Sequence, residues 1–172
     1  MDTDDRTNMD GYLVRIRIQR DIRMRIDMAA ASDCPEETIR LLAVDPDHDV
    51  RYAVAKRAHI SEHVSRILAH DADAYIRYTT AKRDDCPESV VADLVYDLDD
   101  LVRSGIALRK DCLASVLELF AHDASADVRR SVALREDLKA KIMDVLARDP
   151  DSVVRHRVAC NPQCSSKNLM AP

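Results

Sequence analysis

The sequence predicts an all-α fold, an α-solenoid (superhelix) of about six 26-residue two-helix repeats, from three observations. Composition is the first, because two glycines and 3% aromatic residues favour helices over sheets. The second is an arginine that recurs every 26 residues without an insertion, and the third is helical spacing of apolar residues within each unit. The recurring arginines are Arg25, Arg51, Arg77, Arg103, Arg129 and Arg155.

The first helix of each unit is expected to contain the recurring arginine. An apolar residue precedes this arginine, an alanine follows it by four positions, and a short polar residue stands four positions before it. Such a residue caps the exposed amides at a helix start. The expected caps are Asp47, Asp73, Asp99, Ser125 and Asp151.

The second helix of each unit is expected after a turn that reads Asp-Cys-Pro-Glu in two units, at 33–36 and 85–88. Proline is favoured at the first turn of a helix, and apolar residues follow at helical spacing, as in Val116, Leu119 and Phe120. Neither helix buries its apolar stripe alone, so neighbouring units are expected to stack.

We expect a single helical-repeat domain over residues 1–172. Residues 1–24 resemble an imperfect preceding unit and are expected to form an N-terminal cap, followed by repeats over 25–164. Residues 165–172 belong to an incomplete last repeat, which is expected to expose apolar residues such as Val158, Leu169 and Met170. We therefore expect either self-association through this C-terminal end or disorder of the last few residues.

An aspartate six residues before each of the last five recurring arginines predicts a structural ladder of ion pairs. Helical geometry places the stem of the recurring arginine partly inside the fold, so its guanidinium needs an acceptor. One carboxylate per junction supplies it. The expected ladder residues are Arg51, Arg77, Arg103, Arg129, Arg155, Asp45, Asp71, Asp97, Asp123 and Asp149.

The cysteines are interpreted as small buried hydrophobes rather than metal ligands. Cys34, Cys86, Cys112 and Cys164 share one repeat position, where other units have Ile60 and Leu138. Stacked helices lie about 8–10 Å apart, which is too far for thiolates of successive units to share one tetrahedral ion. We therefore expect no metal site, no cofactor and no disulfide.

A family resemblance lies in three stretches: Val154-Arg155-His-Arg-Val-Ala-Cys-Asn161-Pro162-Gln-Cys164, Asp33-Cys34-Pro35-Glu36-Glu37 and Asp149-Pro150-Asp151. The sequence resembles the leucine-rich repeat variant family, which is close to HEAT-like repeats. The likeness covers roughly residues 21–170. It implies a right-handed solenoid of paired helical segments. The unit here is longer than that family's usual one, and Asn-Pro before the cysteine occurs only at 161–162.

The sequence favours a non-enzymatic protein–protein interaction scaffold that binds through an exposed row of the first helices. The positions one, two and five after each arginine point away from the apolar stripe. They mix aromatic and cationic residues, which suits an acidic protein segment as partner. The candidate binding residues are Tyr52, Lys56, Tyr78, Lys82, Arg130, His156 and Arg157.

The alternative is a HEAT-like nucleic-acid-binding protein or DNA glycosylase, which grips a duplex along a basic face. A formal net charge of −5 and the absence of Trp argue against it. No apolar run approaches the roughly 18 residues of a membrane span, and the acidic start is unlike a secretory signal. We therefore expect a cytoplasmic protein.

Overall fold

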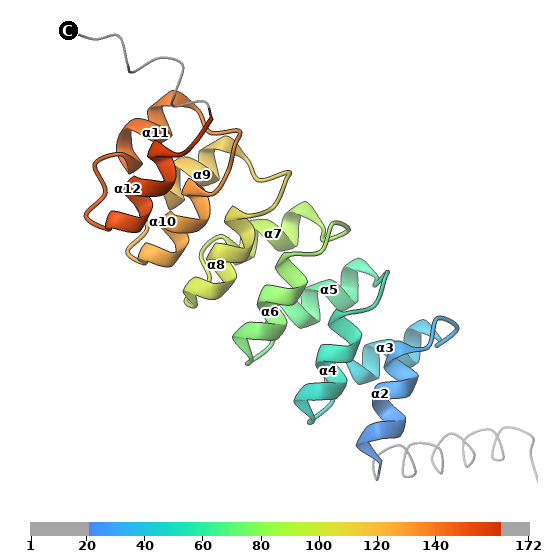
Figure 1. Ribbon diagram of the computed structural model, residues 1–172. Coiled ribbons are helices and arrows are strands. Elements are labelled where there is room, and N and C mark those ends of the chain that lie inside the picture. The colour runs from blue at the N-terminus through green and yellow to red at the C-terminus, as the bar shows by residue number, and fades with distance from the viewer. Residues whose placement is uncertain (1–20, 163–172) are drawn as a thin grey trace, which may run out of the picture. The chain divides into compact units, whose positions relative to one another are not determined.

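The computed structural model describes residues 21–162, and this part of the chain is all-helical, with eleven α-helices and no strand. The all-α prediction is therefore confirmed (Figure 1). In chain order the helices are α2 (Ile22–Ala30), α3 (Glu36–Leu42), α4 (His48–Ala55), α5 (Glu62–Ala69), α6 (Ala74–Ala81), α7 (Glu88–Leu94), α8 (Asp100–Ala107), α9 (Ala114–Phe120), α10 (Ala126–Ala133), α11 (Ala140–Leu146) and α12 (Ser152–Ala159).

The helices alternate between two kinds, which we call A helices (α2, α4, α6, α8, α10 and α12) and B helices (α3, α5, α7, α9 and α11). Successive A helices begin 26 residues apart, as at His48 and Ala74, and so do successive B helices, as at Glu62 and Glu88. The recurring arginine lies in each A helix. The sequence period is thus also the period of the helix starts.

Side-chain caps set the start of the A helices. The side chain of Asp99 accepts a hydrogen bond from the backbone N–H of Leu101, and Ser125 does the same for Asp127. Asp47, Asp73 and Asp151 cap α4, α6 and α12 in the same way. All five predicted caps are therefore confirmed.

The core is formed by the apolar stripe that the sequence predicts on each helix. The residue before the recurring arginine is fully buried in α4, α6, α8, α10 and α12, and Phe120 of α9 is 1% exposed. A β-branched residue suits this site in the A helix because its stiff side chain fills a fixed space. The position of a residue relative to the recurring arginine therefore determines whether its side chain is buried in the A helix.

Two compact units divide the chain between His70 and Asp71, and each is described by itself. Unit 1 covers the described residues 21–70. In it α2 packs on α3 and α4, and α5 packs on α3 and α4. Its core includes Ile39, Val54 and Leu68, all at most 2% exposed.

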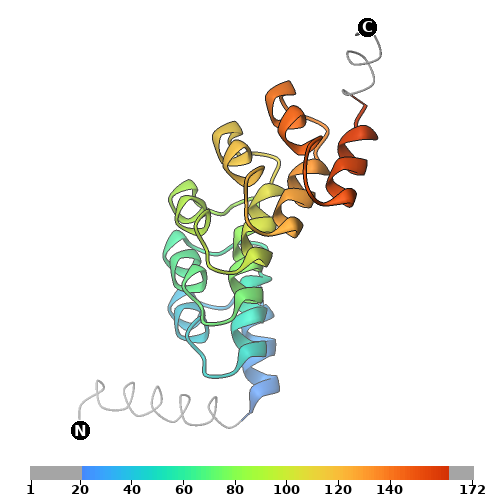
Figure 2. The same ribbon diagram turned by 90° about the vertical axis from the view of Figure 1, so that its left-hand side faces the viewer.

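Unit 2 covers the described residues 71–162 and consists of two layers (Figures 1 and 2). The A helices α6, α8, α10 and α12 pack directly on one another in sequence order. Each of α7, α9 and α11 packs on the two A helices that flank it in the chain. The A helices are therefore the continuous layer of this unit.

The C-terminal end of unit 2 differs from the expectation in one residue. Val158 was expected to be exposed, but it is 1% exposed, because α12 packs on both α10 and α11 and covers it. Residues 1–20, most of the expected N-terminal cap, and residues 163–172, with Cys164, Leu169 and Met170, lie outside the described residues. No helix in the described part is long and apolar enough to cross a bilayer.

Candidate binding surface

The recurring arginines of unit 2 form bidentate ion pairs with aspartates twenty residues later. The Nε of Arg103 donates to Oδ2 of Asp123 at 2.7 Å, and its Nη2 donates to Oδ1 at 2.9 Å. Arg77 makes the same pair of bonds to Asp97, and Arg129 to Asp149. Each aspartate lies in the turn before the next A helix, so every pair joins two successive helix pairs.

The same side chains also fix the turns at both ends of the ion pair. The Nη1 of Arg103 donates to the backbone carbonyls of Asp97 at 2.7 Å and Leu98 at 3.2 Å. Oδ1 of Asp123 additionally accepts the backbone N–H of Ser125 at 2.8 Å. One junction therefore combines a charged pair with backbone hydrogen bonds on either side of it.

The remaining ladder residues occupy equivalent places. In unit 1, Arg25 pairs with Asp45, with Nε 2.8 Å from Oδ2. Arg51 and Arg155 donate to the backbone carbonyls five and six residues before them, and Asp71 accepts the backbone N–H of Asp73. These contacts hold the turns that precede α4, α12 and α6.

The three bidentate pairs of unit 2 keep their charges at neutral pH. Burial acts to raise the pKa of Asp97, Asp123 and Asp149, but hydrogen bonds from the partner arginine and from the backbone outweigh it and hold each pKa below its usual range. The same hydrogen bonds raise the pKa of the partner arginines. Neither partner of these three pairs therefore exchanges protons near pH 7.

A second set of arginines, which follow the A helices, was not predicted from the sequence. Nη1 of Arg109 donates to the carbonyls of Ala81 and Arg83, which lie at the end of the preceding A helix, α6. Arg135 and Arg57 reach α8 and α2 in the same way, and the Nδ2 of Asn161 donates to the carbonyl of Arg135 at 2.7 Å. These side chains satisfy carbonyls that a helix end leaves open.

An open groove of about 530 Å³ crosses the exposed side of α6, α8, α10 and α12, and we call it the A groove. Three of the predicted binding residues, Tyr78, Arg130 and Arg157, line it. Four partly exposed apolar side chains that the prediction did not include also line it: Leu101, Leu108, Leu134 and Val153. The groove is therefore more apolar than the sequence reasoning expected.

The other four predicted binding residues lie outside the lining of this groove. Tyr52 and Lys56 belong to α4 and its C-terminal cap in unit 1. His156 is exposed on α12. Lys82 is exposed at the end of α6, with its Nζ 5.3 Å from the centre of the Tyr78 ring, close enough for a cation–π contact.

Tyr78 is held at one end of the A groove by a close approach to the next A helix. A Cβ at Gly105 of α8 would lie 2.6 Å from Cδ2 of Tyr78, so only glycine leaves room for the ring there. The ring also stacks on Tyr75, with the centroids 5.8 Å apart. Gly105 therefore has a packing role that a glycine inside a helix does not reveal by sequence alone.

Arg130 sits in the groove with its charge already compensated. Its Nη2 donates to Asp151 at 2.6 Å, and its Nη1 donates to Asp127 at 2.7 Å. The hydrogen bond from Arg130 lowers the pKa of Asp151 to about 2. Arg130 is therefore a weaker attractant for an acidic partner than the sequence reasoning assumed.

The cysteines are less uniformly buried than expected. Cys86 is buried, but Cys34 and Cys112 are only half-buried. Burial raises the pKa of both Cys86 and Cys112 to about 11, so these thiols are protonated at neutral pH. In the described part of the chain, no three His, Cys, Asp or Glu side chains are grouped as metal ligands.

Comparison of the chain with family models, curated proteins and solved structures gives no match.

Proposed function

We propose that this chain is a non-enzymatic protein-interaction scaffold, and that the A groove is where it binds a partner segment. The observation that carries the proposal is the groove itself, in which four partly exposed apolar side chains lie beside Tyr78 and two arginines. Interface centres combine aromatic and apolar anchors with a polar rim in this way. The proposal includes a right-handed α-solenoid of the leucine-rich repeat variant or HEAT-like type, with about six repeats and a cytoplasmic location.

The partner is proposed to be a short protein segment with apolar side chains and at least one acidic residue. Leu101, Leu108 and Leu134 offer contact area to the apolar side chains. The acidic residue would face Lys82 or Arg157 rather than Arg130, whose guanidinium is already paired with two aspartates. Electrostatic complementarity of this kind chiefly raises the association rate and the specificity.

The groove chemistry favours protein over nucleic acid. Asp100 and Asp127 line the A groove beside the arginines. These carboxylates repel a phosphate backbone, whose affinity for proteins depends on uncompensated Lys and Arg. The DNA-binding alternative gains no support from this surface.

A selection of peptides from a random displayed library against the full chain tests the proposal. We expect enriched sequences with apolar residues and Asp or Glu, which bind with lower affinity to the variant Leu108→Glu/Leu134→Glu. Burying two introduced carboxylates beside apolar groups costs at least about 2 kcal/mol, or more than tenfold in Kd. The matched control is Leu119→Glu on α9, which alters a similarly exposed leucine outside the groove and should bind normally.

The outcomes separate the two parts of the proposal. Peptides that bind the Leu108→Glu/Leu134→Glu variant as tightly as the parent would exclude the A groove as the binding surface. If binding depends on the leucines but is unchanged in Lys82→Gln/Arg157→Gln, the groove stands and the acidic partner is rejected. Circular dichroism of each variant checks that the helices remain folded.

A further inference from the structure

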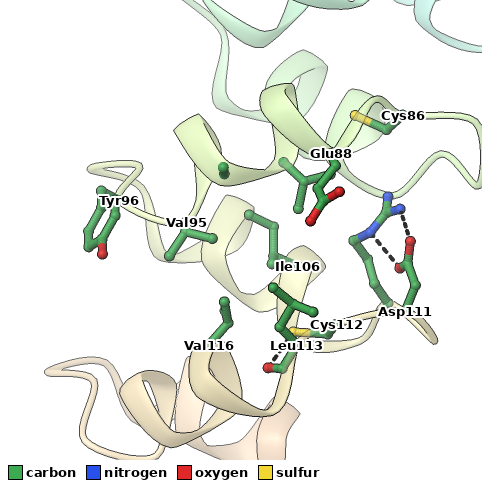
Figure 3. Close-up of a pocket in the computed structure, with 12 residues that line it drawn as sticks. Cys86, Glu88, Val95, Tyr96, Ile106, Asp111, Cys112, Leu113 and Val116 are labelled. Carbon is green, nitrogen blue, oxygen red and sulfur yellow. Dashed lines mark hydrogen bonds and ion pairs between the residues drawn. The ribbon is translucent and has the colours of Figure 1, made fainter.

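Unit 2 contains a second, separate cavity of about 450 Å³ between α7 and α9, next to the segment that joins α8 to α9 (Figure 3). It shares no lining residue with the A groove. Its walls are mainly apolar, with Val91, Val95, Leu113 and Val116 among the lining residues. Cavities that hold small molecules have about 300–1,000 Å³ and largely apolar walls.

The equivalent space at the next junction is smaller. Between α9 and α11 the equivalent space is about 260 Å³, and an ion pair crosses it, with Nζ of Lys141 3.1 Å from Oε2 of Glu118. The residues 26 positions earlier are Ser115 and Ala92, which are too short to make that bridge. The cavity between α7 and α9 therefore remains open.

The repeat pattern does not require a small residue at Ala92. The other B helices have a long or charged side chain at this repeat position, namely Arg40, Arg66, Glu118 and Asp144. Leu113 is likewise the large aliphatic residue at a position occupied elsewhere by Pro35, Ser61, Pro87 and Lys139. Ala92 leaves this junction hollow, and Leu113 adds to its apolar lining.

The polar groups of the cavity favour a cation over an anion. Arg109 uses four of its five donors within the protein, on Asp111 and on the carbonyls of Ala81 and Arg83. The Glu88 carboxylate projects into the space between α7 and α9 (Figure 3). The Cys86 and Cys112 thiols are uncharged, because burial raises their pKa to about 11, so they extend the apolar wall.

We propose that this cavity is a binding site for a small apolar molecule that carries one protonated amine, with the apolar body between α7 and α9 and the ammonium group at Glu88. The apolar lining supplies the hydrophobic contact and Glu88 supplies a charge-assisted hydrogen bond. Anionic analogues are excluded by Glu88 and Asp111, since no cation in the lining is left unpaired to receive them.

Three probes of similar length, which share a phenylalkyl body and differ at the polar end, test the proposal on the full chain: 4-phenylbutylamine, 4-phenylbutanol and 4-phenylbutyrate. Titration followed by methyl NMR should show saturable shifts at Val91, Val95 and Val116, with a Kd for the amine on the order of 1 mM or lower. The alcohol should bind up to about fivefold more weakly and the carboxylate weakest, since Glu88 is exposed and an exposed ion pair contributes at most about 1 kcal/mol.

Two variants locate the site. Glu88→Gln should reduce amine binding by up to about fivefold, to the level of the alcohol, and leave the alcohol unchanged. Ala92→Leu, on the exposed edge of the cavity, should fill it and weaken both probes at least about tenfold. The controls are Glu136→Gln and Ala140→Leu, which make the same changes at exposed positions outside the cavity.

The proposal is overturned if no probe gives saturable shifts up to about 10 mM, a limit at which binding is too weak to be specific. It is also overturned if the three probes bind equally, or if Ala92→Leu leaves the amine affinity unchanged. Loss of binding in the two control variants would show that the shifts arise elsewhere. The result does not depend on the A groove, whose residues are unchanged in every variant.

Discussion

Replacing Asp123 by alanine removes more contacts than replacing any ordinary surface carboxylate, and we expect this change to destabilise unit 2 strongly. The Asp123 side chain accepts two hydrogen bonds from Arg103 and one from the backbone of Ser125. In the Asp123→Ala variant, the guanidinium loses its carboxylate and the turn before α10 loses its internal bond.

The expected cost follows from how far this pair is removed from water. The side chains of Arg103 and Asp123 are 16% and 10% exposed. Exposed ion pairs contribute about 0.2–1 kcal/mol, whereas removing one partner of a buried pair costs about 3–5 kcal/mol. With residual solvent screening at these exposures, we expect the free energy of unfolding to fall by about 3 kcal/mol.

Urea unfolding followed by circular dichroism at 222 nm measures this cost. The matched control is Glu62→Ala, which breaks the ion pair with Arg66, whose side chains are 58% and 51% exposed. That pair spans one helical turn at the surface, so its loss should cost only about 0.5 kcal/mol. The double variant Arg103→Met/Asp123→Ala completes a mutant cycle with the two single changes.

The reasoning fails if Asp123→Ala costs no more than Glu62→Ala. It also fails if the cycle yields a coupling energy below about 0.5 kcal/mol, because the ladder would then be a set of independent surface charges. A coupling of at least about 1.5 kcal/mol is the expected result for a bidentate pair with this little exposure.

Three further predictions follow from the contacts in unit 2. Asp97, Asp123 and Asp149 have lowered pKa values, so their stabilising charge is complete above the ordinary aspartate pKa of about 3.9 and is lost as the pH falls through the lower folded values. Urea midpoints should therefore drop on acidification below about pH 4, and Asp123→Asn should flatten that drop. The buried Cys86 thiol, with its pKa raised to about 11, should react with a thiol reagent at pH 8 at least about tenfold more slowly than the exposed Cys160, as measured by mass spectrometry after timed quenching. Gly105→Ala should not raise the free energy of unfolding by the roughly 1 kcal/mol that alanine adds in an open helix, because the new Cβ displaces the Tyr78 ring. The same displacement should weaken the binding of groove-selected peptides, and an equal or higher affinity would contradict this account.

The helices and their starts follow from the sequence because they depend on local chemistry. Asp99 and Ser125 cap helices through their own neighbouring amides, and Val102 is buried because of its place relative to the arginine in the same helix. These relations repeat every 26 residues, so the single sequence is enough to reveal them.

The groove and the cavity depend on distances between side chains of different repeats, which the period does not encode. Nothing local shows that Gly105 accommodates Tyr78, or that Arg109 reaches back to α6. The ion pair between Arg130 and Asp151 is likewise not predictable from the sequence, because the two residues lie 21 positions apart, which is not the ladder spacing. A residue-by-residue comparison of the units does carry one usable signal, namely Ala92 in place of a charged side chain.

The fixed spacing of the ladder has a consequence for how the length of this chain can change. Arg77 pairs with the residue at 97, and Arg103 with the residue at 123, so every partner is found twenty residues ahead. Removing residues 97–122, a stretch of 26, would bring Asp123 to the place that Asp97 holds and give Arg77 an equivalent carboxylate. A deletion that is not a multiple of 26 residues would place a residue other than the recurring aspartate opposite the guanidinium. A whole 26-residue module can therefore be removed from unit 2 with the ladder intact, but the contact of Tyr78 with the next A helix would have to be redesigned, because Ser131 would take the place of Gly105.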